Sequence, residues 1–247
     1  MLLKVLTWNI HKGFSIGNRR LIIAEAREAM RATGADIIFL QEVQGEHQVF
    51  AKEYPEWPTS AQFEYLADTV WHHHAYGKNA VYDEGHHGNA ILSKYPIISW
   101  HNLDLTLHRQ EMRGMLHAQI EIPETGQRIH LLNTHINLLH THRIQQVTKI
   151  CDYISHHVPH SEKLLLAGDF NDWGKKLSGP LCDSLDMEEI YSVLYGHHGK
   201  TFPCFFPVLS LDRMYFRHLK PLKAKILTSR PWVTLSDHLP IYAEVEV

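Results

Sequence analysis

The stretches LKVLTWNI at residues 3–10 and ADIIFLQEV at residues 35–43 decide the fold, because a helix pattern separates them. Both are apolar runs typical of strands, and polar residues follow where each run ends. From about Arg19 to Thr33, apolar residues recur at helical spacing, and Gly34 follows where glycine commonly ends a helix. A strand, a helix and a second strand in this order predict a βαβ unit.

The rest of the chain alternates between strand patterns and a few helix patterns. GluThrGly at 124–126 predicts a hairpin turn between two strands in residues 115–136, and residues 143–158 predict a helix. Further strand patterns lie at 88–100, 163–171, 211–216 and 240–247. Many strands with two or three flanking helices predict an α/β (α+β) chain with two packed sheets covered by helices. Composition shows no break, so we expect a single domain over residues 1–247.

Composition and charge limit the partners. The chain is 44% hydrophobic and 21% charged, which is ordinary for a globular protein, and its net charge is −3 with histidine neutral. This balance leans away from long duplex DNA. The N-terminus lacks signal-peptide features, and no window has the roughly 20 apolar residues of a membrane span. We therefore expect a cytoplasmic monomer with no membrane span.

The 21 histidines include runs at 72–74, 86–87, 156–157 and 197–198. These runs favour solvent-facing or locally hydrogen-bonded side chains over a dedicated metal site. Only His135 and His238 stand in contexts that favour chemistry. The three cysteines match neither a zinc spacing nor a disulfide framework.

Polar side chains gather where the predicted strands end, which is where rigid scaffolds present catalytic groups. The set is Asn9, Glu42, His135, Asp169, Asn171, Asp212, Asp237 and His238. Taken singly, most of them have an ordinary explanation as a turn former, a helix cap or a salt-bridge partner. Together they supply carboxylate and carboxamide oxygens, the ligands that suit Mg²⁺ or Mn²⁺. Without a cation, clustered carboxylates would raise one another's pKa values and destabilise the fold.

These residues lie in motifs that resemble the endonuclease/exonuclease/phosphatase family, to which deoxyribonuclease I belongs. The motifs are TWNIH at 7–11, LQE at 40–42, GNAILSKYPI at 88–97, NTH at 133–135, GDFN at 168–171, LDRMY at 211–215 and SDHLPI at 236–241. They follow the family's order over nearly the whole chain. The resemblance implies a deoxyribonuclease I-like four-layer α/β/β/α sandwich. It also implies Mg²⁺- or Mn²⁺-dependent hydrolysis of a phosphodiester or phosphomonoester by in-line attack of water.

The resemblance assigns the metal to three positions. Glu42 matches the principal metal-binding carboxylate, and Asn9 and Asp237 match residues that touch or support the metal.

The same resemblance assigns catalytic roles to five residues. Asp169 and Asn171 match the pair that orients the attacking water and the scissile phosphate. Asp212 matches the carboxylate that fixes the imidazole of His238, a base or a stabiliser of phosphate charge. His135 matches a general acid of the deoxyribonuclease I and sphingomyelinase branches. The division between acid and base stays open from sequence.

Three more positions are candidates for binding substrate or phosphate: Arg113, Asn89 and His11. Arg113 either contacts phosphate or pairs with Glu111. The chain departs from the AP endonucleases at His11, where they carry an aspartate, and at His135, where they lack histidine. Both departures argue against repair of abasic sites.

Substrate class stays open between three hypotheses. The first is a hydrolase of nucleic acid, and the second a hydrolase of a smaller or lipid-linked phosphate ester. The third is a catalytically silent member that acts as a binding module, which the complete polar set disfavours. The segment TFPCFFPVLS at 201–210 is either a substrate lip or a proline-braced loop packed on the core.

Overall fold

The computed structural model describes residues 1–247, which form two six-stranded sheets. The first sheet has the order β11 (Lys220–Ile226), β12 (Ile241–Glu246), β1 (Leu2–Asn9), β2 (Ile37–His47), β4 (Gly85–Ser93) and β3 (His73–Tyr82). The second has the order β5 (Ile97–Asp104), β6 (Gly114–Ile122), β7 (Gln127–His135), β8 (Lys163–Asp169), β10 (Asp212–Arg217) and β9 (Glu188–Glu189).

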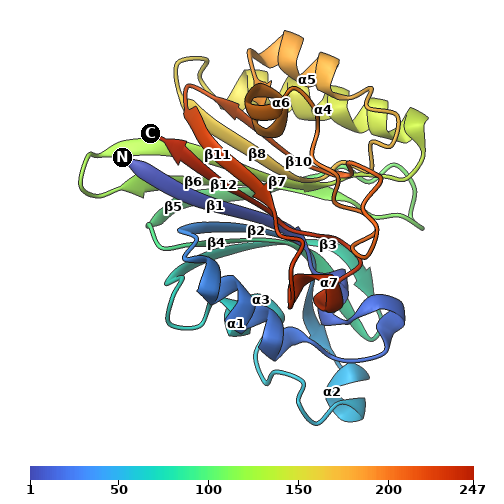
Figure 1. The fold of residues 1–247 in the computed structure, drawn as a ribbon. Coiled ribbons are helices and arrows are strands. Elements are labelled where there is room, and N and C mark those ends of the chain that lie inside the picture. The colour runs from blue at the N-terminus through green and yellow to red at the C-terminus, as the bar shows by residue number, and fades with distance from the viewer.

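Helices cover the outer faces of both sheets, as Figure 1 shows. They are α1 (Ile23–Thr33), α2 (Phe50–Glu53), α3 (Gln62–Ala67), α4 (His140–His157), α5 (Ser178–Leu185), α6 (Ile190–Tyr195) and α7 (Trp232–Leu235). α1 and α3 lie outside the first sheet and α4 and α5 lie outside the second, whereas α6 covers the edge between the sheets, where it contacts β10 and β11 and adds Ile190 to the core between them. This arrangement confirms the predicted four-layer sandwich. None of the helices is both long and apolar enough to cross a membrane.

Strand alternation divides the core into three apolar layers. Leu131 belongs to the cluster between the sheets, whereas its neighbour Leu132 packs in the cluster below α4 and α5. On β1, Val5 likewise faces the second sheet and Leu6 faces α1. Because successive strand residues point to opposite faces, both faces of the central strands are buried, whereas the edge strands β5 and β11 are largely exposed or half-buried.

Each sheet contains one parallel pair of strands. β1 pairs with β2 and β7 pairs with β8, and a helix links each pair, α1 in the first sheet and α4 in the second. The other pairs are antiparallel. Carboxyl ends of parallel strands meet at one edge, and there Asn9 pairs with Gln41 and His135 pairs with Asp169. The predicted strand ends therefore come from two βαβ units, one in each sheet.

Asn133 joins the two sheets just below this edge. Its fully buried amide donates to the carbonyls of Leu40 and Ala90, each at 2.8 Å, and its Oδ1 accepts from Gln41 at 2.7 Å. Because its donors and its acceptor are all paired, burial of this amide carries little penalty. The bridge fixes the strand ends of β7 against those of β2 and β4.

The predicted elements are found with shifted ends. The first helix begins at Ile23 rather than near Arg19, and it ends at Gly34, whose φ of +67° is one that glycine adopts without strain. Gly126, with a φ of +66°, closes the predicted hairpin between β6 and β7. The strand pattern over 88–100 corresponds to two strands, β4 and β5, which residues 94–96 separate.

Candidate active site

Asp169 is the centre of the polar cluster, at the carboxyl end of β8. Neighbouring strands place His135 beside it on β7 and Asp212 beside it on β10. Asp169 is 2% exposed, and its Oδ2 lies 3.1 Å from Asn9 Nδ2, 3.5 Å from His135 Nε2 and 3.8 Å from His238 Nε2. One carboxylate oxygen therefore gathers groups from both sheets.

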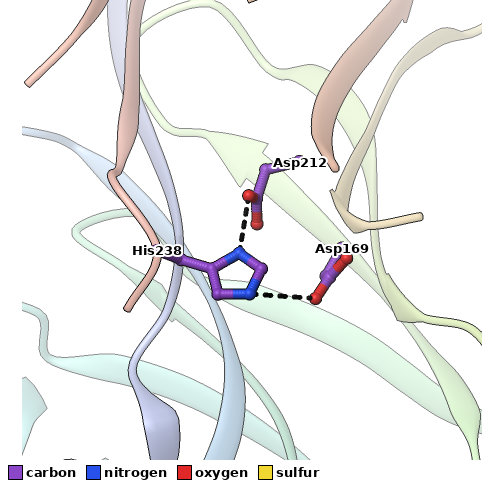
Figure 2. A group of neighbouring side chains, drawn as sticks. All are labelled: Asp169, Asp212 and His238. Carbon is purple, nitrogen blue, oxygen red and sulfur yellow. Dashed lines mark hydrogen bonds and ion pairs between the residues drawn. The ribbon is translucent and has the colours of Figure 1, made fainter. Parts of the chain in front are cut away.

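His238 lies between two carboxylates, as Figure 2 shows. Its Nδ1 is 2.8 Å from Asp212 Oδ2, and its Nε2 faces Asp169. Thr201 also donates to Asp212 Oδ2, at 2.6 Å. Since an ionised aspartate only accepts hydrogen bonds, Nδ1 carries a proton. Asp212 therefore fixes both the tautomer and the orientation of the ring.

The buried charges shift the pKa values of this group. Burial opposes the charge on His238, but the charges of Asp212 and Asp169 outweigh it and raise the pKa of His238 to about 10. Burial raises the pKa of Asp169, against the attraction of His238. Burial, helped by the positive charge of Arg113, lowers the pKa of His135 well below its usual range. The site therefore combines a cationic ring at His238 with a neutral ring at His135.

Glu42 enters the site through an irregularity in β2. The β2–β4 register shifts between Leu40 and Val43, and Glu42 has a φ of +57°. Such a bulge turns a side chain away from the regular alternation, and backbone strain of this kind is common at functional sites. The Glu42 carboxylate lies 3.4 Å from Asn9 Nδ2 and 4.0 Å from His135 Nδ1, and it forms no ion pair with a lysine or arginine. It is an acidic group without a fixed cation partner.

Asp237 pairs with His11, which also contacts Asn9. His11 Nδ1 is 2.8 Å from Asp237 Oδ1, and the His11 backbone N–H donates to Asn9 Oδ1 at 3.0 Å. The hydrogen bond to Asp237 raises the pKa of His11. Burial works against ionisation of Asp237, but this bond and the positive charges of His238 and His11 together outweigh burial and lower the pKa of Asp237. His11 thus orients Asp237 and Asn9 together.

The remaining candidates have fixed protein partners. Arg113 pairs with Glu111 at 3.1 Å, which is one of the two interactions predicted for it. Its Nε is buried without a partner. The Asn171 amide donates to the Ile136 carbonyl at 2.9 Å, and its backbone N–H donates to Asp169 Oδ1 at 2.9 Å. Contacts of Arg113 and Asn171 with phosphate stay predictions.

Asn89 is 1% exposed and supports the strand ends. Its amide donates to the carbonyls of Gly114 at 3.0 Å and Asn133 at 3.3 Å. These two bonds tie β4 to β6 and β7. A direct contact of Asn89 with substrate also stays a prediction.

Two contributors were not found from the sequence. Thr201 anchors Asp212, and Asn133 joins the sheets, yet both act through side-chain contacts between distant segments. The available signal was that Asn133 stands in the quoted motif NTH and that Thr201 begins the segment TFPCFFPVLS. The segment 201–210 combines both of its predicted characters, because Cys204 is buried whereas Phe205 is 72% exposed and Phe206 is 69% exposed.

The donor chemistry of the cluster fits a hard divalent cation. Glu42, Asp169, Asp212 and Asp237 bring four carboxylates together. Asp169, Asp212 and His238 already place one possible ligand atom each within 4.8 Å of one another. Asp212 Oδ1 is also buried without a partner. An excess of acidic oxygen over fixed cations is the environment in which Mg²⁺ or Mn²⁺ is bound.

Comparison with known proteins identifies the family and the fold. Residues 6–238 match the model of the Endonuclease/Exonuclease/phosphatase family. The uncharacterized protein YbhP of Escherichia coli (strain K12) is 44% identical over 244 residues, which cover 99% of this chain and 96% of that protein.

Solved structures share the fold at low sequence identity. The endonuclease/exonuclease/phosphatase from Bacteroides vulgatus matches with a TM-score of 0.77 at 17% identity, covering 100% of this chain and 99% of that one. The mannosyl-6-phosphatase of Bacteroides thetaiotaomicron matches with a TM-score of 0.73 at 16% identity, covering 99% and 100%. D. rerio TDP2 complexed with a single strand DNA product matches with a TM-score of 0.70 at 17% identity, covering 100% and 99%. By its family match over nearly its whole length, its relative and its fold, the chain belongs to the endonuclease/exonuclease/phosphatase family.

Proposed function

We propose that this protein is a divalent-metal-dependent hydrolase of phosphate esters, with Asp169 and His238 as its central catalytic residues. The observation that carries the proposal is the convergence on Asp169 Oδ2 of Asn9 from the first sheet, His135 from the second and His238 from the loop before β12. Endonucleases, exonucleases and phosphatases, the enzymes for which the family is named, all hydrolyse phosphate esters.

Glu42 and Asp237 are the residues that would hold the cation, with Asn9 beside them. Hydrogen bonds to Asp237 fall on Oδ1, which leaves Oδ2 for a ligand, and Glu42 accepts only a long bond from Asn9. His238 is a poorer ligand than the cluster's spacing suggests, because carboxylates face both of its nitrogens. When bound, Mg²⁺ or Mn²⁺ supplies positive charge that polarises the phosphate toward attack.

The protein's own groups divide the remaining tasks. Asp169, held by the Asn9 amide and the Asn171 backbone, accepts a proton from the attacking water. His238, protonated at both nitrogens between Asp212 and Asp169, neutralises charge on a non-bridging phosphate oxygen. His135 donates a hydrogen bond to the leaving oxygen. Fixed donors of this kind need no reorganisation during the reaction.

Asp169, His238 and the residues around them form the edge of the sandwich that we call the rim. Apolar side chains around the rim favour a substrate whose alcohol part is apolar or aromatic. Leu138 and Leu139 follow β7 and are 52% and 58% exposed, and Trp173, two residues after Asn171, is 54% exposed. The loop of Phe205 and Phe206 begins near His238, because the Phe202 ring lies 4.9 Å from the His238 ring. Structures of the same fold include TDP2 with a single strand DNA product and a mannosyl-6-phosphatase. At identities of 16–17%, these matches assign neither substrate to this chain.

The proposal is tested with bis-p-nitrophenyl phosphate and p-nitrophenyl phosphate in Mg²⁺, in Mn²⁺ and in EDTA. We expect turnover of at least one ester with metal and none in EDTA, and the preferred ester separates diesterase from monoesterase activity. Plasmid DNA, RNA and phospholipid then extend the panel. Absence of hydrolysis of every substrate would support the alternative of a catalytically silent binding module instead.

A further inference from the structure

A second group of polar side chains lies on the outer face of the second sheet, beneath α4. On β6 the apolar residues Leu116, Ala118 and Ile120 face the other sheet, so His117 and Gln119 face outward. The strand registers place His101 of β5 opposite His117, and His130 of β7 opposite Gln119. Helix α4 adds His157, and the turn before β8 adds Glu162.

These side chains line a cavity of about 330 Å³. It is separate from the candidate active site, because His130 and His135 are five positions apart on β7, or about 16 Å at the rise of a strand. His130 is 4% exposed, whereas His101 and His157 are exposed. Nothing in the proposed hydrolysis uses this group.

The hydrogen bonds of the group hold two imidazole nitrogens face to face. His130 Nε2 lies 2.5 Å from Glu162 Oε2, and His117 Nδ1 lies 3.0 Å from the Tyr153 hydroxyl. The inner nitrogens, His117 Nε2 and His130 Nδ1, are 2.7 Å apart. His130 donates its outer N–H to Glu162, as metal-binding histidines commonly do to an oxygen, so its inner Nδ1 carries a lone pair. In the metal-free protein this lone pair accepts from His117 Nε2–H.

His157 offers a third nitrogen. Its Nδ1 lies 2.9 Å from the carbonyl oxygen of Tyr153, which only accepts hydrogen bonds, so Nδ1 carries the proton. In the neutral ring the lone pair is then on Nε2. In the metal-free protein the ring stacks on Tyr153 with centroids 4.2 Å apart, beside the cavity. To bind a metal together with the other two rings, this exposed side chain must turn toward them.

We propose that His117, His130 and His157, with His101 or water as a fourth ligand, form a site for a borderline transition-metal ion such as Zn²⁺ or Co²⁺. Two histidine nitrogens on a tetrahedral zinc, each about 2.0–2.1 Å from the metal, are roughly 3.3 Å apart. The facing pair, 2.7 Å apart, must therefore open by about 0.6 Å, and both rings must turn so that their lone pairs meet at the metal. Binding moves one proton of His117 from Nε2 to Nδ1, where Tyr153 accepts it, and releases none. Imidazole nitrogens select Zn²⁺, Co²⁺ or Ni²⁺ over Mg²⁺.

The test is a titration of the metal-free full-length protein with Co²⁺ in excess Mg²⁺, followed by visible absorption. Mg²⁺ occupies oxygen ligands, so the Co²⁺ signal reports nitrogen ligands. We expect one equivalent of Co²⁺ to bind with the intense absorption bands of a tetrahedral ion. Zn²⁺ added in place of Co²⁺ should raise Tm above that of the metal-free protein. The double variant His117→Gln, His130→Gln should lose the bands, whereas a matched pair of exposed histidines, His156→Gln and His160→Gln, should keep them.

The single variant His157→Ala guards against misfolding, because this side chain is exposed. It should weaken Co²⁺ binding at least tenfold while the far-UV circular dichroism stays that of the wild type. Absence of tetrahedral bands in the wild type would overturn the proposal and leave the group as a hydrogen-bonded chain. Bands that survive in the His117→Gln, His130→Gln protein would overturn it as well.

Discussion

Histidine is used in opposite ways in two regions: the proposed catalytic rim around Asp169 and His238, and the group of His117, His130 and His157 beneath α4, here called the histidine face. At the rim, carboxylates face both nitrogens of His238, and despite burial they raise its pKa to about 10. On the histidine face, burial, with His130 and other histidines nearby, lowers the pKa of His117 to about 4. The difference shows that the groups around an imidazole, not its burial alone, set its charge.

The same contrast separates the cations that each region suits. The rim offers oxygen atoms from Glu42 and Asp237, which suit Mg²⁺ or Mn²⁺. The histidine face offers nitrogen atoms, which suit Zn²⁺ or Co²⁺. We therefore expect changes at the rim to alter turnover, and changes at the histidine face to alter metal binding and stability without carrying the chemistry.

The largest expected effect is that of Asp169→Asn at the rim. Losing the proton acceptor should lower kcat by about a thousandfold, within the range for general acid–base catalysis. The amide keeps the shape of the carboxylate, so Tm should move by only a few degrees. Steady-state kinetics on bis-p-nitrophenyl phosphate measure the loss, with the exposed Asp183→Asn as control. Activity above a tenth of wild type would rule out Asp169 as the acceptor.

Glu42→Gln should mainly change the metal requirement. Removing the unpaired carboxylate should raise the Mg²⁺ concentration for half-maximal turnover at least about tenfold. Loss of a partner that only orients a metal ligand already lowers metal affinity by about tenfold or more, and Glu42 is proposed to bind the metal directly. Mg²⁺ titrations of the variant and of Glu46→Gln, an exposed glutamate of the same strand, make the comparison. Equal Mg²⁺ requirements would place the cation elsewhere.

Thr201→Val tests how firmly Asp212 must hold His238. It removes the 2.6 Å hydrogen bond to Asp212 from a fully buried position. A hydrogen bond to a charged group contributes about 2 kcal/mol, so we expect lower stability and about a tenfold lower kcat. Thr201→Ser restores the hydroxyl and should recover most of the activity. If valine and serine variants behaved alike, the hydroxyl would have no part in positioning.

The smallest effect is a change in acid stability at the histidine face. The pKa of His117 is about 4 in the folded protein and 6.5 in an unfolded chain, so between these values the unfolded chain binds the extra proton. Stability should therefore fall as pH drops from 6.5 toward 4. His117→Gln should make this fall shallower in urea unfolding measured in EDTA at pH 7 and pH 5. Parallel pH profiles would show that His117 does not control acid stability.

The rim was largely predictable because three of its residues end apolar strands, whereas Asp212 begins a strand and Asp237 and His238 lie in a loop before one. Asn9, His135 and Asp169 end β1, β7 and β8, and parallel pairing inside each sheet brings such ends together. Glu42 was assigned through its motif, since alternation alone does not reveal the bulge that turns it into the site. Thr201 was missed because its contact with Asp212 depends on the path of a loop.

The histidine face was not predicted, because its two central histidines stand outside the histidine runs and only His157 belongs to one. His117 and His130 are single histidines 13 residues apart, and only the register of the β6–β7 hairpin brings them together. The alternation around His117, with apolar residues on either side, contained the signal that these rings share an outward face. What covers that face, helix α4, follows from tertiary packing and not from local sequence.

The central claim is that the rim is a metal-dependent phosphoesterase centre in which His238 is essential. Its most direct test is the rate of bis-p-nitrophenyl phosphate hydrolysis as a function of Mg²⁺, for wild type and for His238→Ala. The account predicts activity that rises with Mg²⁺, vanishes in EDTA and is lost in the variant, whose circular dichroism stays that of the wild type. Activity that survives in His238→Ala, or that ignores EDTA, would contradict it.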